Sequence, residues 1–131
     1  MEEFTGMDRY LCVLVGGGFG SLTRYLVGRA FIQRFPNVNF GLGTFFVNVT
    51  GSFLIGILMT LFVERLRLSH NWQLIGVVGF LGGYTTFSSF EYDGYLAARS
   101  GHHLTALAYL VGSVVLGYAG VWLGAFLVTK R

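Results

Sequence analysis

Two phenylalanines at helical spacing stand beside hydroxyl side chains in the third apolar stretch of the chain. Phe87 and Phe90 are three residues apart and project from one face of a helix, next to Thr86, Ser88 and Ser89. A phenyl ring is positive at its edge, so an anion approaching edge-on is attracted without meeting a full cation. Nearby hydroxyls can donate the hydrogen bonds that water otherwise supplies. Lipid contact or core packing is the alternative interpretation of the same two rings.

A single amide interrupts the second apolar stretch. Asn48 lies there with Thr44 four residues earlier on the same helical face. Its NH₂ group carries two donors and can replace part of the hydration shell of an anion. The alternative is an interhelical hydrogen bond, which is typically worth about 0.6 kcal/mol in a membrane. The sequence favours the two interpretations equally.

Arg24 places a charge within the first apolar stretch. Its guanidinium keeps its proton, and a charge at the centre of a membrane helix costs about 2.5–3.5 kcal/mol. No Asp or Glu lies within a helical turn of it. Arg24 therefore either extends toward the membrane surface or attracts anions at the mouth of a pore.

The backbone just before the phenylalanine pair is poor helix. Residues 79–86 read GFLGGYTT, and adjacent glycines followed by paired threonines lower helix propensity. We expect a break near residues 82–86. Carbonyls released at a break within a membrane suit a small monovalent cation, since no carboxylate accompanies them. A simple kink is the alternative.

The elements that must position these residues are predicted to be membrane helices. The chain has 131 residues, of which 53% are hydrophobic and only 11% charged, whereas soluble domains carry roughly a quarter charged residues. One crossing needs about 20 apolar residues. The sequence therefore predicts one all-α integral membrane domain over residues 1–131, with four transmembrane helices. These are expected at residues 10–31, 44–63, 72–95 with the break inside it, and 104–129.

Several function classes are excluded by the remaining residues. The net charge is +3, but the cations are scattered, so nucleic acid is not expected as a partner. Cys12 is the only cysteine, which excludes an intramolecular disulfide and a cysteine metal site. No nucleophile triad or metal-hydrolase spacing occurs, and Glu91 and Asp93 point to different sides of a helix. We expect neither an enzyme nor an organic cofactor.

The positive charges specify orientation only weakly. Four spans would place five cations on the side of the N-terminus and three on the other, which is a small bias. Insertion in both directions is then physically plausible, and an antiparallel pair could assemble. Small residues four apart, such as Gly16 and Gly20, predict closely packed helices. The five cations are Arg9, Arg65, Arg67, Lys130 and Arg131, and the three are Arg29, Arg34 and Arg99.

With these residues described, the sequence resembles the Fluc family of small dual-topology bacterial fluoride channels. The resemblance covers nearly the whole chain and rests on four motifs. They are GxxxG followed by Arg24, residues 43–51 (GTFFVNVTG), residues 79–90 (GFLGGYTTFSSF) and residues 109–113 (YLVGS).

The resemblance implies an antiparallel homodimer in the bacterial inner membrane, with two parallel pores that let toxic cytoplasmic fluoride leave passively. Each pore would be lined by both subunits. Arg24 corresponds to an arginine near a pore vestibule in this family. The implied pore residues are Phe87, Phe90, Asn48, Ser88, Ser89, Tyr109 and Ser113.

The resemblance also implies a structural sodium ion at the dimer centre, held by main-chain oxygens of Gly82 and Thr85 from both subunits. Two positions depart from the family pattern. Gly117 stands where the family often has a further hydroxyl, and Asp93 stands where it usually has a glutamate. The fourth-helix polar track is therefore expected to be shorter, and the role of the acid less secure.

Two rival functions remain. A small proton-coupled multidrug exporter shares the length and helix count, but it needs an acid within its first helix, and none lies between Asp8 and Arg24. A non-transporting membrane scaffold would treat Arg24, Asn48 and the broken helix as packing features only.

Overall fold

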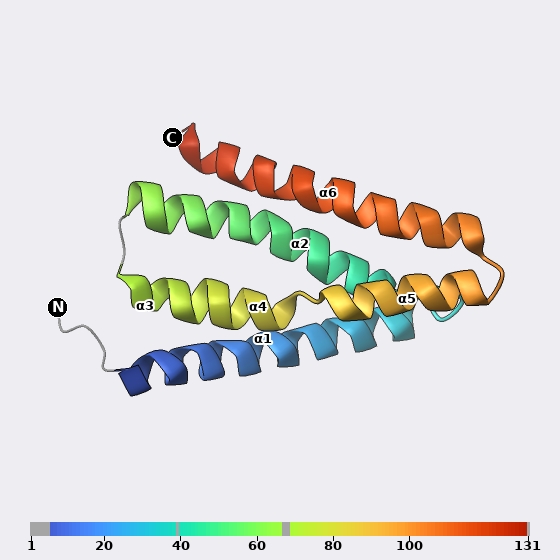
Figure 1. Cartoon of the computed structure of the whole chain (residues 1–131), viewed down its shortest axis with the longest axis horizontal. Helices are drawn as coiled ribbons and strands as arrows, with labels where there is room; N and C mark the ends of the chain where they lie inside the picture. Colours follow the sequence, from blue (N-terminus) through green and yellow to red (C-terminus); the bar gives the residue numbers. More distant parts are fainter. Residues whose placement is uncertain (1–5, 39, 67–68, 131) are drawn as a thin grey trace.

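The computed structural model describes residues 6–38, 40–66 and 69–130, and every regular element within them is a helix (Figure 1). Two segments, η1 and η2, are π-helical and continue the neighbouring α-helices without a turn. The elements in chain order are α1 (Gly6–Arg34), α2 (Leu42–Met59), η1 (Thr60–Arg65), α3 (His70–Gln73), η2 (Leu74–Leu81), α4 (Gly82–Tyr84), α5 (Phe87–Arg99) and α6 (His103–Thr129).

Three of these helices are long and apolar enough to cross a membrane. They cover Gly6–Arg34, Leu42–Arg65 and His103–Thr129. Most of the large apolar side chains of the described chain are exposed rather than buried. In water such a surface would drive aggregation, whereas lipid covers it at no cost. The chain is an all-helical, multi-pass membrane protein.

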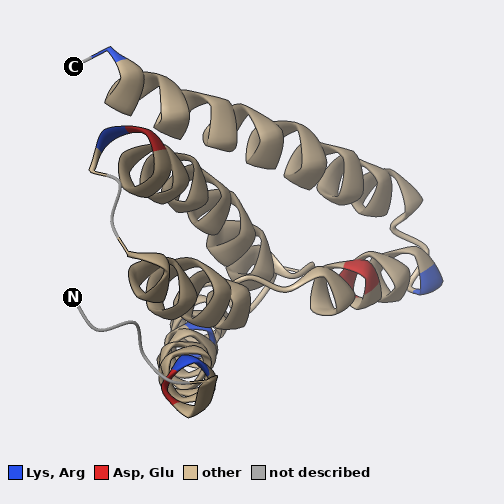
Figure 2. Cartoon of the chain, turned by 60° about the vertical axis from the view of Figure 1, so that its left-hand side comes forward, with Lys and Arg blue, Asp and Glu red and all other residues tan. Residues whose placement is uncertain are grey.

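The helices extend past the apolar stretches that predicted them. α1 covers Gly6–Arg34 rather than 10–31, and α2 continues through η1 to Arg65 rather than ending at 63. Polar residues at a helix end reach water and prolong the helix beyond the hydrocarbon. Figure 2 shows charged residues at the ends of η1, α5 and α6. Two of the five cations counted above, Arg67 and Arg131, lie outside the described residues.

The segment between α2 and α6 in the chain consists of two parts that lie end to end (Figure 1). The first part, α3 to α4, packs mainly on α1, and the second part, α5, packs mainly on α6. α2 packs along α6 and also contacts α1. The interruption between α4 and α5 therefore lets one stretch of chain exchange one partner helix for another.

Glycines bring the helix backbones together. A Cβ built on Gly20 would collide with the Phe80 carbonyl, and one built on Gly56 would collide with the Val121 carbonyl. Gly124 faces the Phe53 carbonyl in the same way. These contacts confirm the close packing predicted from the small-residue spacings. The small buried cluster beside them consists of Val47, Leu81 and Tyr84.

Candidate functional site

The interruption between α4 and α5 consists of two threonines, Thr85 and Thr86. Thr85 has φ −88° and ψ 158°, and Thr86 has φ −153° and ψ 124°, so both are extended. Both lie within the range 82–86 in which the glycines and the paired threonines predicted a break, whereas Gly82 and Gly83 themselves remain helical. The Thr86 hydroxyl oxygen accepts a hydrogen bond from the Ser89 N–H at 3.3 Å and so caps α5. β-Branched residues tolerate extended backbone well, which places the break after the glycines.

The Asn48 side chain of α2 holds this extended backbone in place. The Thr86 N–H donates to Asn48 Oδ1 at 2.7 Å, and Asn48 Nδ2 donates to the Thr86 carbonyl at 2.8 Å. One amide thus satisfies both polar groups of a residue that has left the helix. A primary amide has two N–H donors, so one N–H of Asn48 remains for another acceptor.

Two backbone carbonyls lose their helical partners at the same place. In an unbroken α-helix the Thr86 N–H would donate to the Gly82 carbonyl and the Ser89 N–H to the Thr85 carbonyl. The first N–H donates to Asn48 and the second to the Thr86 hydroxyl instead. The carbonyls of Gly82 and Thr85 therefore lack the N–H donors of a regular helix.

A pocket of about 180 Å³ lies beside the break. The rings of Phe87 and Phe90 are 5.7 Å apart, centroid to centroid. Phe87 is 70% exposed and Phe90 only 7%, so one ring closes the pocket from within while the other stands at its open side. No residue of the lining is charged. The lining residues are Asn48, Ser52, Thr86, Phe87, Phe90, Ser113 and Val114.

The hydroxyls of this pocket differ in what they offer an anion. Ser113 Oγ donates to the carbonyl of Tyr109 at 2.6 Å, so its proton becomes available only if the hydroxyl rotates. No described residue forms a hydrogen bond with the Ser52 hydroxyl. Sequence reasoning missed Ser52, although it lies one turn after Asn48 on the same helical face. That spacing was the signal that could have identified it.

Tyr109 lies behind the pocket rather than in its lining. Its ring centroid is 5.5 Å from that of Phe90 and 5.6 Å from that of Phe40. Its hydroxyl donates to Asp93 Oδ2 at 3.4 Å. Asp93 lines a second pocket of about 160 Å³ at the start of α2, where a Cβ on Gly41 would collide with the carboxylate. A row of aromatic rings thus connects the two pockets.

Two predicted pore residues, Ser88 and Ser89, and the predicted vestibule residue Arg24 lie outside both pockets. Ser88 is exposed, and Ser89 takes part in the cap of α5, where Thr86 Oγ1 donates to its hydroxyl at 3.1 Å. Arg24 is partly exposed on α1 and lines neither pocket. The structure therefore brings together Asn48, Phe87, Phe90 and Ser113, with Tyr109 behind them.

Known proteins resemble this chain over most of its length. Residues 11–125 match the family model described as CrcB-like protein, Camphor Resistance (CrcB). A Solibacter usitatus protein named fluoride-specific ion channel FluC is 53% identical over 122 residues, which is 93% of this chain and 99% of that protein. Proteins with the same name from Hydrogenobaculum sp. and Rhizobium meliloti are 50% and 43% identical, each over 90% of this chain and over 95% and 94% of their own lengths. These matches confirm the family predicted from the motifs, and the chain belongs to the CrcB-like protein family.

Proposed function

We propose that this protein is a fluoride-selective channel through which cytoplasmic fluoride leaves a bacterial cell passively. The observation that carries the proposal is the neutral pocket in which Asn48, Phe87 and Phe90 meet. Its relatives carry the name of fluoride-specific ion channels. An inside-negative potential favours anion exit by about 2.3 kcal/mol per 100 mV, so a passive path suffices for export across the inner membrane.

The pocket supplies weak, neutral contacts that suit a small hard anion. The remaining N–H of Asn48 donates a hydrogen bond, and the edges of Phe87 and Phe90 offer partial positive charge. The hydroxyls of Ser52 and Ser113 add donors when they rotate inward. No full cation lines the pocket, so the ion is attracted without being trapped, which conduction requires.

We further propose that two subunits assemble antiparallel, with two pores between them. Phe87 stands 70% exposed at the open side of the pocket, so a second subunit is needed to close the path. The end-to-end pair of α3–α4 and α5 would form the fourth crossing, beside the three apolar helices. In this arrangement the exposed Ser88 faces the partner subunit together with Ser89, and Arg24 attracts anions to a vestibule.

A structural sodium ion fits the break. The carbonyls of Gly82 and Thr85 lack regular helical donors and are hard oxygen ligands. Among the described residues, no group of three His, Cys, Asp or Glu could hold a metal, so the ligands would be neutral, as a monovalent ion prefers. An ion bound between two subunits would attract the carbonyl oxygens at the break of each one and so hold the two breaks together.

Fluoride efflux from sealed proteoliposomes tests the proposal. A fluoride-selective electrode records release after a potassium ionophore relieves the voltage, and chloride efflux is followed in parallel. We expect fast fluoride release without chloride release, and none from protein-free vesicles. Absence of fluoride release from a purified, folded dimer would overturn the channel function and favour a scaffold. Proton-driven uptake of a cationic dye would favour the exporter, which the lack of an acid between Asp8 and Arg24 argues against.

A further inference from the structure

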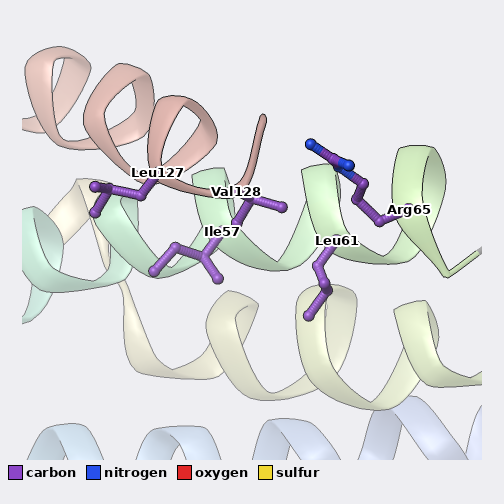
Figure 3. A pocket seen from close by; sticks show the side chains of 5 residues that line it. All are labelled: Ile57, Leu61, Arg65, Leu127 and Val128. Atoms are coloured by element: carbon purple, nitrogen blue, oxygen red, sulfur yellow. The ribbon is translucent and has the colours of Figure 1, made fainter. Parts of the chain in front are cut away.

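A third concave surface lies away from the two pockets described above, between the end of the second apolar helix and the last turn of α6. It is an open groove of about 520 Å³ (Figure 3). Its lining combines four aliphatic side chains with one arginine. The lining residues are Ile57, Leu61, Arg65, Leu127 and Val128.

The groove lies just beyond the closest approach of α2 and α6. Gly56 and Gly124 allow the backbones of α2 and α6 to approach so closely that a Cβ on either glycine would collide with the other helix. Just beyond them, Ile57, Leu61 and Arg65 follow one another at four-residue spacing along one face of α2 and η1. Figure 3 shows these three side chains in succession, with Arg65 beyond the last turn of α6. The result is an apolar slot with a cation at its outer end.

The cation is held in place by the end of α6. The Arg65 guanidinium donates to the Thr129 carbonyl at 2.5 Å, which fixes it over the slot. A guanidinium has five N–H donors, so several remain directed to the exposed side. Lys130 follows Thr129 directly, so two cations stand here against one acid, Glu64, which precedes Arg65. This helix end carries net positive charge.

We propose that this groove binds an anionic phospholipid of the surrounding bilayer. Its acyl chain would lie on Ile57, Leu61 and Leu127, and its phosphate would accept hydrogen bonds from Arg65. The planar fork of arginine matches two phosphate oxygens. Basic pockets between membrane helices take anionic headgroups in this way. The site requires only that the chain lies in a bilayer, so it is independent of fluoride conduction.

Lipid retention by the purified full-length protein tests the site. Native mass spectrometry in detergent compares titrations with dioleoyl phosphatidylglycerol and with dioleoyl phosphatidylcholine. We expect half-saturation with the anionic lipid at about fivefold lower concentration. Arg65→Gln should abolish this preference. Arg99→Gln, at an arginine that is also exposed and lies at the end of α5, is the matched control and should retain it.

A second variant tests the apolar part of the groove. Leu127→Trp fills the slot from a half-exposed position and should weaken retention of both lipids. Equal retention of the two lipids by the unmodified protein, or equal behaviour of Arg65→Gln and Arg99→Gln, would overturn the proposal. If Arg65→Gln does not fold, unchanged lipid retention by Leu127→Trp overturns it instead. Loss of dimer by Leu127→Trp with unchanged lipid retention would assign the groove to a second copy of the chain.

Discussion

The side chain of Asn48 forms two hydrogen bonds with the backbone of Thr86, 38 residues further along the chain. Thr86 donates its N–H at 2.7 Å and accepts from Nδ2 at 2.8 Å. The amide therefore bonds both backbone polar groups of Thr86, whose N–H would donate to the Gly82 carbonyl in an unbroken helix. Because the same two bonds leave one N–H of Asn48 free, the residue that stabilises the break also faces the pocket. Fold and anion contact depend on a single side chain here.

Asn48→Asp should destabilise the protein and slow fluoride flux. The carboxylate still accepts from the Thr86 N–H but cannot donate to the Thr86 carbonyl. A carboxylate oxygen and the carbonyl oxygen of Thr86, both acceptors, then face each other. We expect a loss of about 1–3 kcal/mol in the free energy of unfolding, measured by circular dichroism in detergent. The added negative charge should also depress efflux from proteoliposomes. Asn71→Asp in α3 is the control, and unchanged stability with faster flux would contradict this account.

Gly20→Ala should disrupt the contact between α1 and η2. An added Cβ would meet the Phe80 carbonyl, which belongs to the backbone and cannot rotate away. Overpacking of this kind costs typically about 1–3 kcal/mol. Gly18→Ala is the matched control in the same helix, since nothing lies within 4 Å of its Cβ position, and it should gain about 0.5–1 kcal/mol from helix propensity. Equal melting temperatures of the two variants would contradict the close approach.

Substitutions of Phe87 and Phe90 should differ in their effect on stability but should both lower conduction. Phe87 is 70% exposed and Phe90 is 7% exposed. Phe87→Ile should change the free energy of unfolding by no more than about 0.5 kcal/mol, whereas Phe90→Ile should lose part of the roughly 3–5 kcal/mol that a buried Phe contributes. Both should lower fluoride efflux because the ring edge is lost. Phe19→Ile on α1 is the exposed control, and normal efflux in both pocket variants would exclude the ring-edge mechanism.

The long helices and the region of the break could be predicted from the sequence, but the ends of the helices could not be placed. A run of apolar residues long enough to cross lipid is a property of composition, so 10–31, 44–63 and 104–129 lie within the three apolar helices observed. The glycine pair and the paired threonines predicted a break near residues 82–86, and the extended residues Thr85 and Thr86 lie within that range. The sequence did not show that the two glycines remain helical, because the position of the break depends on a bond to Asn48 from another helix.

Part of the candidate site could also be predicted from the sequence. Asn48 and Phe90 were identified because their residue types are unusual or regularly spaced, and the structure places both in one pocket. Tyr109 lies behind Phe90 and not in the pocket lining, and its hydroxyl donates a hydrogen bond to Asp93. Ser52 was missed because serines are common in small-residue helix contacts. Which hydroxyl faces a cavity depends on how the helices pack against one another. The spacing of residues along the sequence does not determine that packing.

Removal of sodium should destabilise the protein, and Thr86→Val should reduce that effect. Valine keeps the shape of threonine but cannot accept from the Ser89 N–H, which then becomes free to donate to the Thr85 carbonyl. The loss of the cap costs about 1 kcal/mol. We expect the melting temperature in sodium chloride to exceed that in N-methylglucamine chloride, with a smaller difference for Thr86→Val. Thr129→Val at the end of α6 is the control. Equal melting in both salts would argue against the cation.

Ser52→Ala should slow fluoride flux without affecting the fold. Gly117 on α6 has no side chain, and its Cβ position lies 3.3 Å from Ser52 Oγ. The serine of α2 therefore supplies a hydroxyl at the place where α6 lacks one. Since no described residue bonds this hydroxyl, its removal should leave stability within about 0.5 kcal/mol. Loss of one donor to an anion costs about 1.5–3 kcal/mol, or roughly ten- to a hundredfold in efflux rate. Ser100→Ala at the end of α5 should conduct normally, and equal efflux from the two variants would remove Ser52 from the path.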